Sequence, residues 1–162
     1  MCPRPYIKNY FLFLVLCFFN VGCSDDDNSA TCRMTRVTME INGEIQNFQA
    51  IGRGIDLREN GLELQLNLDR RSNNPFRQQT VSVILPYRTT GENTITEFYY
   101  NQNIDNTEFS GDFTDGSLKS NVLTNNRYCF YATFSGSLSD GIQELVIRDG
   151  ELSFEYEIPF DE

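Results

Sequence analysis

The 162-residue chain contains no histidine and no tryptophan, and its 13 basic residues are outnumbered by 23 acidic ones. Without histidine it lacks the usual general base and the usual partner of a serine or cysteine nucleophile. The commonest metal ligand is missing for the same reason. A formal net charge of −10 argues against nucleic acid, because a phosphate backbone requires a basic stripe. The sequence therefore predicts a protein that is not an enzyme, needs no metal or other cofactor and binds no nucleic acid.

Long apolar runs are scarce as well, and the main one lies near the N-terminus at residues 11–19 (FLFLVLCFF). A membrane-spanning helix needs about 20 apolar residues, whereas the apolar part of a signal peptide needs roughly 7–15. Arg4 and Lys8 precede the run and supply the positive charge that such a signal carries. We therefore expect residues 1–22 to be a secretory signal peptide.

The end of this segment resembles the lipobox of bacterial lipoproteins. Residues 21–23 (VGC) match its last three positions, although Asn20 stands where leucine is usual. The resemblance implies that Cys23 carries a diacylglyceryl lipid; the alternative is an ordinary signal followed by a coincidental cysteine. Residues 24–27 (SDDD) resemble the acidic stretch of surface-exposed lipoproteins of the Bacteroidota. We therefore expect residues 23–32 to be an outer-membrane lipid anchor and tether, exposed at the cell surface rather than facing the periplasm.

The cysteine count then leaves one pair. Cys2 and Cys17 leave with the signal and Cys23 takes the lipid, so Cys32 and Cys129 remain in an oxidising compartment. We predict a disulfide between them; the alternative is a buried free thiol at Cys129 and an unpaired Cys32. Cys129 alternates with an aromatic face of its strand, so the bridge is expected over the outside of the sheet.

From residue 33 onward, apolar residues recur with a period of two, and turn signals such as Asn42-Gly43 separate the runs. Residues 33–162 therefore predict one all-β domain, an antiparallel β-sandwich or partly closed barrel of about nine strands. An up-and-down β-barrel is the alternative. The residues expected in its core are Leu62, Leu64, Leu66, Leu68, Val81, Val83, Phe130, Phe134 and Phe154.

Three stretches interrupt this pattern. Residues 70–79 predict a polar loop around Pro75, and residues 101–127 predict a single short strand, near residues 109–113. Asp149-Gly150 predicts a tight turn between two strands.

Two motifs resemble a broad class of small Bacteroidota lipoproteins of unknown function. They are an early hairpin at residues 41–50 (INGEIQNFQA) and a late pattern that begins at residues 134–138 (FSGSL) and continues through Ile147, Gly150 and Phe154. This resemblance implies an all-β lipoprotein and carries no activity with it.

Five residues are candidates for ligand contact. Tyr99 and Tyr100 fall in a strand where neighbours point to opposite faces, so at least one aromatic side chain is expected to face solvent. Arg70, Arg71 and Arg77 cluster in the expected loop, where they suit an anionic group on a glycan or partner. The plainer alternatives are an edge-strand tyrosine that covers the sheet and arginines that balance local acids.

Two function classes remain open. One is a non-catalytic binding module for a glycan, peptide or protein, which a groove lined by tyrosine and arginine would favour. The other is a structural or assembly accessory of an outer-membrane complex, which a flat apolar patch would favour.

Overall fold

The structure, a computed structural model, describes residues 32–73, 76–113 and 117–161. The expected signal peptide, Cys23 and the tether up to residue 31 lie outside the described residues. No helix in the described part of the chain is long and apolar enough to cross a bilayer. The strands are β1 (Arg36–Ile41), β2 (Glu44–Asn47), β3 (Gln49–Arg58), β4 (Gly61–Asn73), β5 (Phe76–Pro86), β6 (Gly91–Glu92), β7 (Glu97–Ile104), β8 (Thr107–Phe113), β9 (Lys119–Asn125), β10 (Cys129–Ser139) and β11 (Glu144–Glu155).

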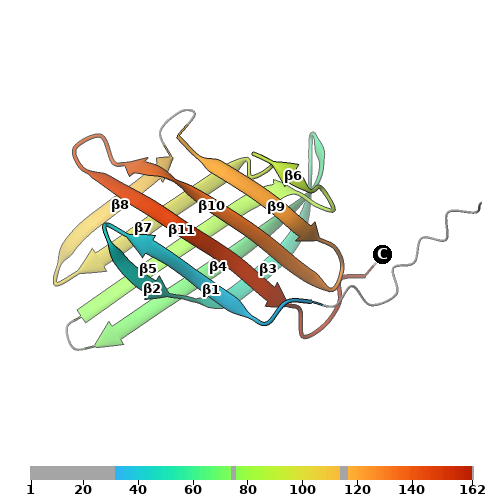
Figure 1. The fold of residues 1–162 in the computed structure, drawn as a ribbon, viewed down its shortest axis with the longest axis horizontal. Helices are drawn as coiled ribbons and strands as arrows, with labels where there is room; N and C mark the ends of the chain where they lie inside the picture. Colours follow the sequence, from blue (N-terminus) through green and yellow to red (C-terminus); the bar gives the residue numbers. More distant parts are fainter. Residues whose placement is uncertain (1–31, 74–75, 114–116, 162) are drawn as a thin grey trace, which may run out of the picture. The chain divides into compact units, whose positions relative to one another are not determined.

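These strands form one curled antiparallel sheet that makes a half-barrel (Figure 1). Nine strands follow the order β2-β1-β11-β10-β8-β7-β5-β4-β3, while β9 pairs with β10 and β6 pairs with β9. The two ends of this path, β2 and β3, are joined directly through Phe48, whose N–H donates to the carbonyl of Val37. The expected all-β, antiparallel, partly closed architecture is confirmed.

The alternation of apolar and polar residues along the strands places the apolar side chains in the core. Leu64, Leu66 and Leu68 of β4 are fully buried, and each lies opposite a buried aliphatic residue of β5. Phe130, Phe134 and Phe154 are buried as expected. The prediction for Leu62 is wrong, because 51% of its side chain is exposed. It is the second residue of β4, opposite the exposed Leu57, and precedes the β4 residues that pair with β5.

The loop predicted at residues 70–79 is mostly strand. The pairing of β4 with β5 continues from Arg70 opposite Gln79 to Asn73 opposite Phe76. Residues 101–127 likewise contain more than one strand, since the end of β7, all of β8 and all of β9 fall within them. Both segments are poor in apolar residues, so the sheet's pairing rather than local hydrophobicity makes them strands.

The turn predicted at Asp149-Gly150 is a bulge inside β11. Asp149 has a φ of 45°, and the register of β11 against β10 shifts between Phe134 and Gly136. The positive φ that the dipeptide favours is present, but it bends one continuous strand instead of reversing the chain.

Gly150 lies against an aromatic ring, which yields a first testable prediction. A Cβ built on Gly150 would lie 2.6 Å from the ring of Phe134, the residue opposite it on β10. Gly150→Ala should lower the free energy of unfolding by about 1–3 kcal/mol, because the buried ring must shift. Gly54→Ala is the matched control, since no atom lies within 4 Å of that Cβ. Urea unfolding compares the two variants, and equal stabilities would contradict the packing described.

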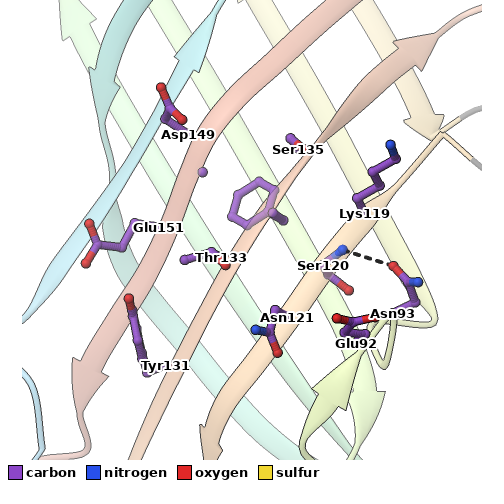
Figure 2. Close-up of a pocket in the computed structure, with 12 residues that line it drawn as sticks. Glu92, Asn93, Lys119, Ser120, Asn121, Tyr131, Thr133, Ser135, Asp149 and Glu151 are labelled. Carbon is purple, nitrogen blue, oxygen red and sulfur yellow. Dashed lines mark hydrogen bonds between the residues drawn. The ribbon is translucent and has the colours of Figure 1, made fainter.

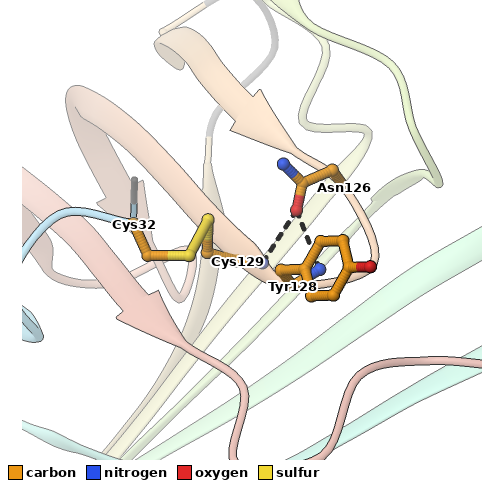
Figure 3. The surroundings of a disulfide bond; sticks show 4 residues. All are labelled: Cys32, Asn126, Tyr128 and Cys129. Atoms are coloured by element: carbon orange, nitrogen blue, oxygen red, sulfur yellow. Dashed lines mark hydrogen bonds between the residues drawn. A yellow bond between two sulfur atoms is a disulfide. The ribbon is translucent and has the colours of Figure 1, made fainter. Parts of the chain in front are cut away.

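The predicted disulfide joins Cys32 to Cys129, with the two Cα atoms 5.8 Å apart (Figure 3). Cys129 alternates with the buried Phe130 and lies on the outer side of β10, where it is only 3% exposed. The Asn126 side chain accepts hydrogen bonds from the backbone N–H groups of Tyr128 and Cys129, which fixes the start of β10. The bridge therefore holds the beginning of the domain against the outside of the sheet.

Candidate functional site

The most distinctive surface is the outer side of β4, β5, β7 and β8. Residues that alternate with the core point outward there, and most of them carry uncharged amide or hydroxyl groups. We call the following set the polar face: Gln65, Asn67, Gln78, Thr80, Ser82, Tyr99, Asn101, Asn103 and Ser110.

Strand pairing arranges the polar face into ordered rows. Adjacent strands lie about 4.8 Å apart, so residues opposite one another form a close-spaced line of hydrogen-bonding groups. The rows are Asn67, Ser82 and Tyr99; Thr80, Asn101 and Ser110; and Gln78 with Asn103. The last two rows line a depression of about 290 Å³. An elongated ligand laid across the strands would meet donors and acceptors at each step.

Tyr99 is the aromatic member of this face. Its side chain is 45% exposed, whereas the flanking Phe98 and Tyr100 are buried, as the alternation of the strand predicts. The negative charge of Glu97 and a hydrogen bond to it raise the pKa of Tyr99. The hydroxyl is therefore engaged by Glu97, while the ring remains exposed to a ligand.

Tyr100 and Arg70 are placed in the interior instead of on a ligand-contact surface. The Gln79 side-chain amide donates to the Tyr100 hydroxyl and to the Gln46 carbonyl, both at 2.6 Å. Arg70 donates to the same Gln46 oxygen at 3.0 Å and to the Gln79 oxygen at 2.6 Å. We call Gln46, Arg70, Gln79 and Tyr100 the interior cluster. Gln46 belongs to β2 and the others to β4, β5 and β7, so these bonds cross the inside of the half-barrel.

Burial shapes the protonation of the interior cluster. Desolvation raises the pKa of Tyr100 to about 12, so its hydroxyl remains protonated and donates a hydrogen bond to the Gln102 side-chain oxygen at 2.9 Å. Desolvation also lowers the pKa of Arg70, with the charge of Arg77 adding to the effect. These two candidates therefore join strands. Sequence inspection missed their partners Gln46 and Gln79. The signal that could have found them is a polar residue at a position of the strand that faces inward.

The remaining arginines do not gather into one site. Arg71 is exposed and forms an ion pair with Asp69 at 2.7 Å on its own strand. Arg77 is half-buried near the start of β5, opposite Ser72 on β4 and Ile104 on β7. Of the five sequence candidates, Tyr99 alone belongs to the polar face.

A second depression, of about 650 Å³, lies on the outer side of β9, β10 and β11 (Figure 2). Its lining is mixed in charge, with Lys119 against Glu92, Asp149 and Glu151. Its tyrosine, Tyr131, is already covered by the Arg33 guanidinium, which lies 4.2 Å from the ring centroid. Within the described residues, no three acidic or cysteine side chains are grouped closely enough to hold a metal ion. This depression therefore offers a ligand less free aromatic surface than the polar face does.

Comparison of the chain with protein-family models, curated protein sequences and solved structures finds no match.

Proposed function

We propose that this chain is a lipid-anchored, non-catalytic binding module of the outer membrane, exposed at the cell surface, and that its ligand is an uncharged glycan. The observation that carries the proposal is the polar face: ordered rows of amide and hydroxyl side chains beside the exposed ring of Tyr99. Sugar hydroxyls both donate and accept hydrogen bonds, and asparagine and glutamine side chains do the same. An aromatic ring adds apolar contact area for the C–H face of a sugar.

Charge favours a neutral ligand over an acidic one. The chain has a net charge of −10, and Glu108 and Asp112 lie beside the polar face. These carboxylates would repel an anionic polysaccharide. Arg71, which lies opposite Gln78 on this side of the sheet, is already paired with Asp69.

The anchor is tested separately from the ligand. We expect mass spectrometry of the membrane fraction to find a mature chain that begins at an acylated Cys23. Acyl chains contribute about 0.8 kcal/mol per buried methylene, so a multiply acylated residue holds the domain stably at the membrane. An intact N-terminus, or an unmodified Cys23 in a soluble fraction, would refute the anchor and leave the ligand proposal standing.

Binding to an array of neutral and acidic glycans tests the ligand proposal. We expect the wild-type chain to retain neutral glycans, and Tyr99→Ala to weaken that binding by about tenfold, because a lost aromatic contact is worth about 1 kcal/mol or more. Leu123→Ala is the matched control, since Leu123 is also exposed but lies on β9, outside the polar face. Failure of every neutral glycan to bind, or equal binding by the Tyr99 and Leu123 variants, would overturn the proposal.

The alternative, a structural or assembly accessory, is favoured by a different feature, the free edge of a strand. Within the described strands, β3 pairs along one edge only, with β4, so its other edge is open to pairing with a neighbouring protein of a complex.

A further inference from the structure

A cleft of about 590 Å³ lies between β3 on one side and the residues of β1 and β11 on the other. Gln49 to Arg53 of β3 form one wall, Thr35 and Val37 form a second, and Phe154 to Ile158 form the third. Phe48 closes the cleft where β1 and β3 converge, because its N–H donates to the Val37 carbonyl. The cleft is therefore a seam bordered on one side by the unpaired edge of β3.

We propose that this seam accepts an extended, basic segment of a partner protein, which pairs with the free edge of β3 as an additional strand. The proposal goes beyond glycan binding and does not depend on it, since the seam and the polar face share no residue.

The edge of β3 is suited to strand addition. It is ten residues long with one bulge between Ala50 and Gly52, and Gln49 to Gly52 are exposed. A long exposed edge presents unpaired N–H and C=O groups, which are a template for another extended chain. Gly54, next to Arg53, carries no side chain and has no atom within 4 Å of the position of a Cβ, so its backbone is open to approach. Proline, which would block pairing, is absent from the strand.

The charges along the seam select a basic occupant. Arg53 is already engaged: it donates to the Ile158 carbonyl, and its guanidinium lies 4.4 Å from the Tyr156 ring centroid and 4.5 Å from that of Phe160. Glu155 and Glu157, by contrast, are exposed and line the cleft. Lysine or arginine in the added strand would pair with these carboxylates, and a second copy of this acidic chain would be repelled.

The lining of the cleft adds a side-chain requirement. Val37, Phe48 and Phe154 are buried apolar residues beneath it, and Ile51 is an exposed apolar residue at its rim. Because side chains of a strand alternate between faces, the added segment should carry apolar residues at every second position and basic or polar residues between them.

Immobilised seven-residue peptides test this. One set alternates valine with lysine and threonine, a second replaces lysine by glutamate, and a third replaces it by serine. We expect the full chain to bind the lysine set at least tenfold more tightly than the glutamate set, with an affinity that falls as salt rises. Hydrogen exchange should show added protection at the amides of residues 49–53 when a lysine peptide is bound.

Charge variants complete the experiment. The double variant Glu155→Gln/Glu157→Gln should lose about tenfold in affinity for the lysine set. Glu40→Gln/Glu144→Gln, which makes the same change in net charge away from the seam, should lose less than threefold. Equal losses in the two variants, equal binding of lysine and glutamate peptides, or protection that spares β3 would overturn the proposal. Glycan binding should be unaffected by either variant, so the two proposals fail independently.

Discussion

Removal of the Cys32–Cys129 bridge is expected to lower the free energy of unfolding by about 2–5 kcal/mol. The bridge spans 97 positions of sequence, so it restricts most of the unfolded domain. In the chain-entropy account a loop of that size contributes somewhat more than 4 kcal/mol, and native-state strain reduces the figure. The segment before β1 has other contacts with β10, among them the 2.9 Å hydrogen bond from Arg33 to the Tyr131 hydroxyl. We therefore expect the variant to fold, with lower stability.

Urea unfolding of Cys32→Ser, followed by circular dichroism, measures the effect. The reduced wild-type chain is the matched control, because it breaks the same bond without changing a side chain. The two should unfold at similar urea concentrations, well below the oxidised protein. If both match the oxidised protein, the bridge contributes nothing to stability and the sheet alone fixes the start of the domain.

Gln79→Leu should lower the free energy of unfolding by about 3 kcal/mol or more. Gln79 is fully buried and makes hydrogen bonds to Gln46, Arg70 and Tyr100. Leucine fills a similar volume but removes three hydrogen bonds of the interior cluster, each worth about 1 kcal/mol or somewhat more. Because the cluster joins β2 to β4, β5 and β7, its loss should also loosen the two ends of the sheet.

The neighbouring residue provides the control. Gln78→Leu makes the same chemical change one position away, on the exposed outer face, and should alter stability by less than about 0.5 kcal/mol. Chemical denaturation of both variants measures the difference. If Gln78→Leu destabilises the protein as much as Gln79→Leu does, the interior cluster has no special role.

The sequence predicted the parts of this fold that depend on alternation alone. Leu64, Leu66 and Leu68 were recognisable because a half-buried strand shows its period locally. Leu62 belongs to the same pattern but lies beyond the residues of β4 that pair with β5, and that limit is set by strand pairing. Asp149-Gly150 was misinterpreted because a turn and a bulge use the same positive φ, and the choice between them depends on the partner strand.

The candidate site was likewise predictable only where it depends on local alternation, and not where it depends on the pairing of distant strands. That at least one aromatic side chain of β7 faces solvent followed from local alternation, but which side of the strand is buried, and so whether Tyr99 or Tyr100 is exposed, did not. The rows of the polar face depend on the register of β5 against β7, which is a long-range property that no single strand records. Arg70 and Gln79 are residue types usually found at the surface, so their inward hydrogen bonds became visible only once Gln46 of β2 was placed across the interior from them.

Side-chain amide signals in a nuclear magnetic resonance titration test the central claim, that the polar face binds a neutral glycan, most directly. The titrant is the neutral glycan that binds best on the array. We predict that the amide signals of Gln78, Asn101 and Asn103 shift together with one dissociation constant, while that of Asn121, in the depression on β9, β10 and β11, stays in place. Shifts confined to Asn121, or no amide shift at saturating glycan, would contradict the claim.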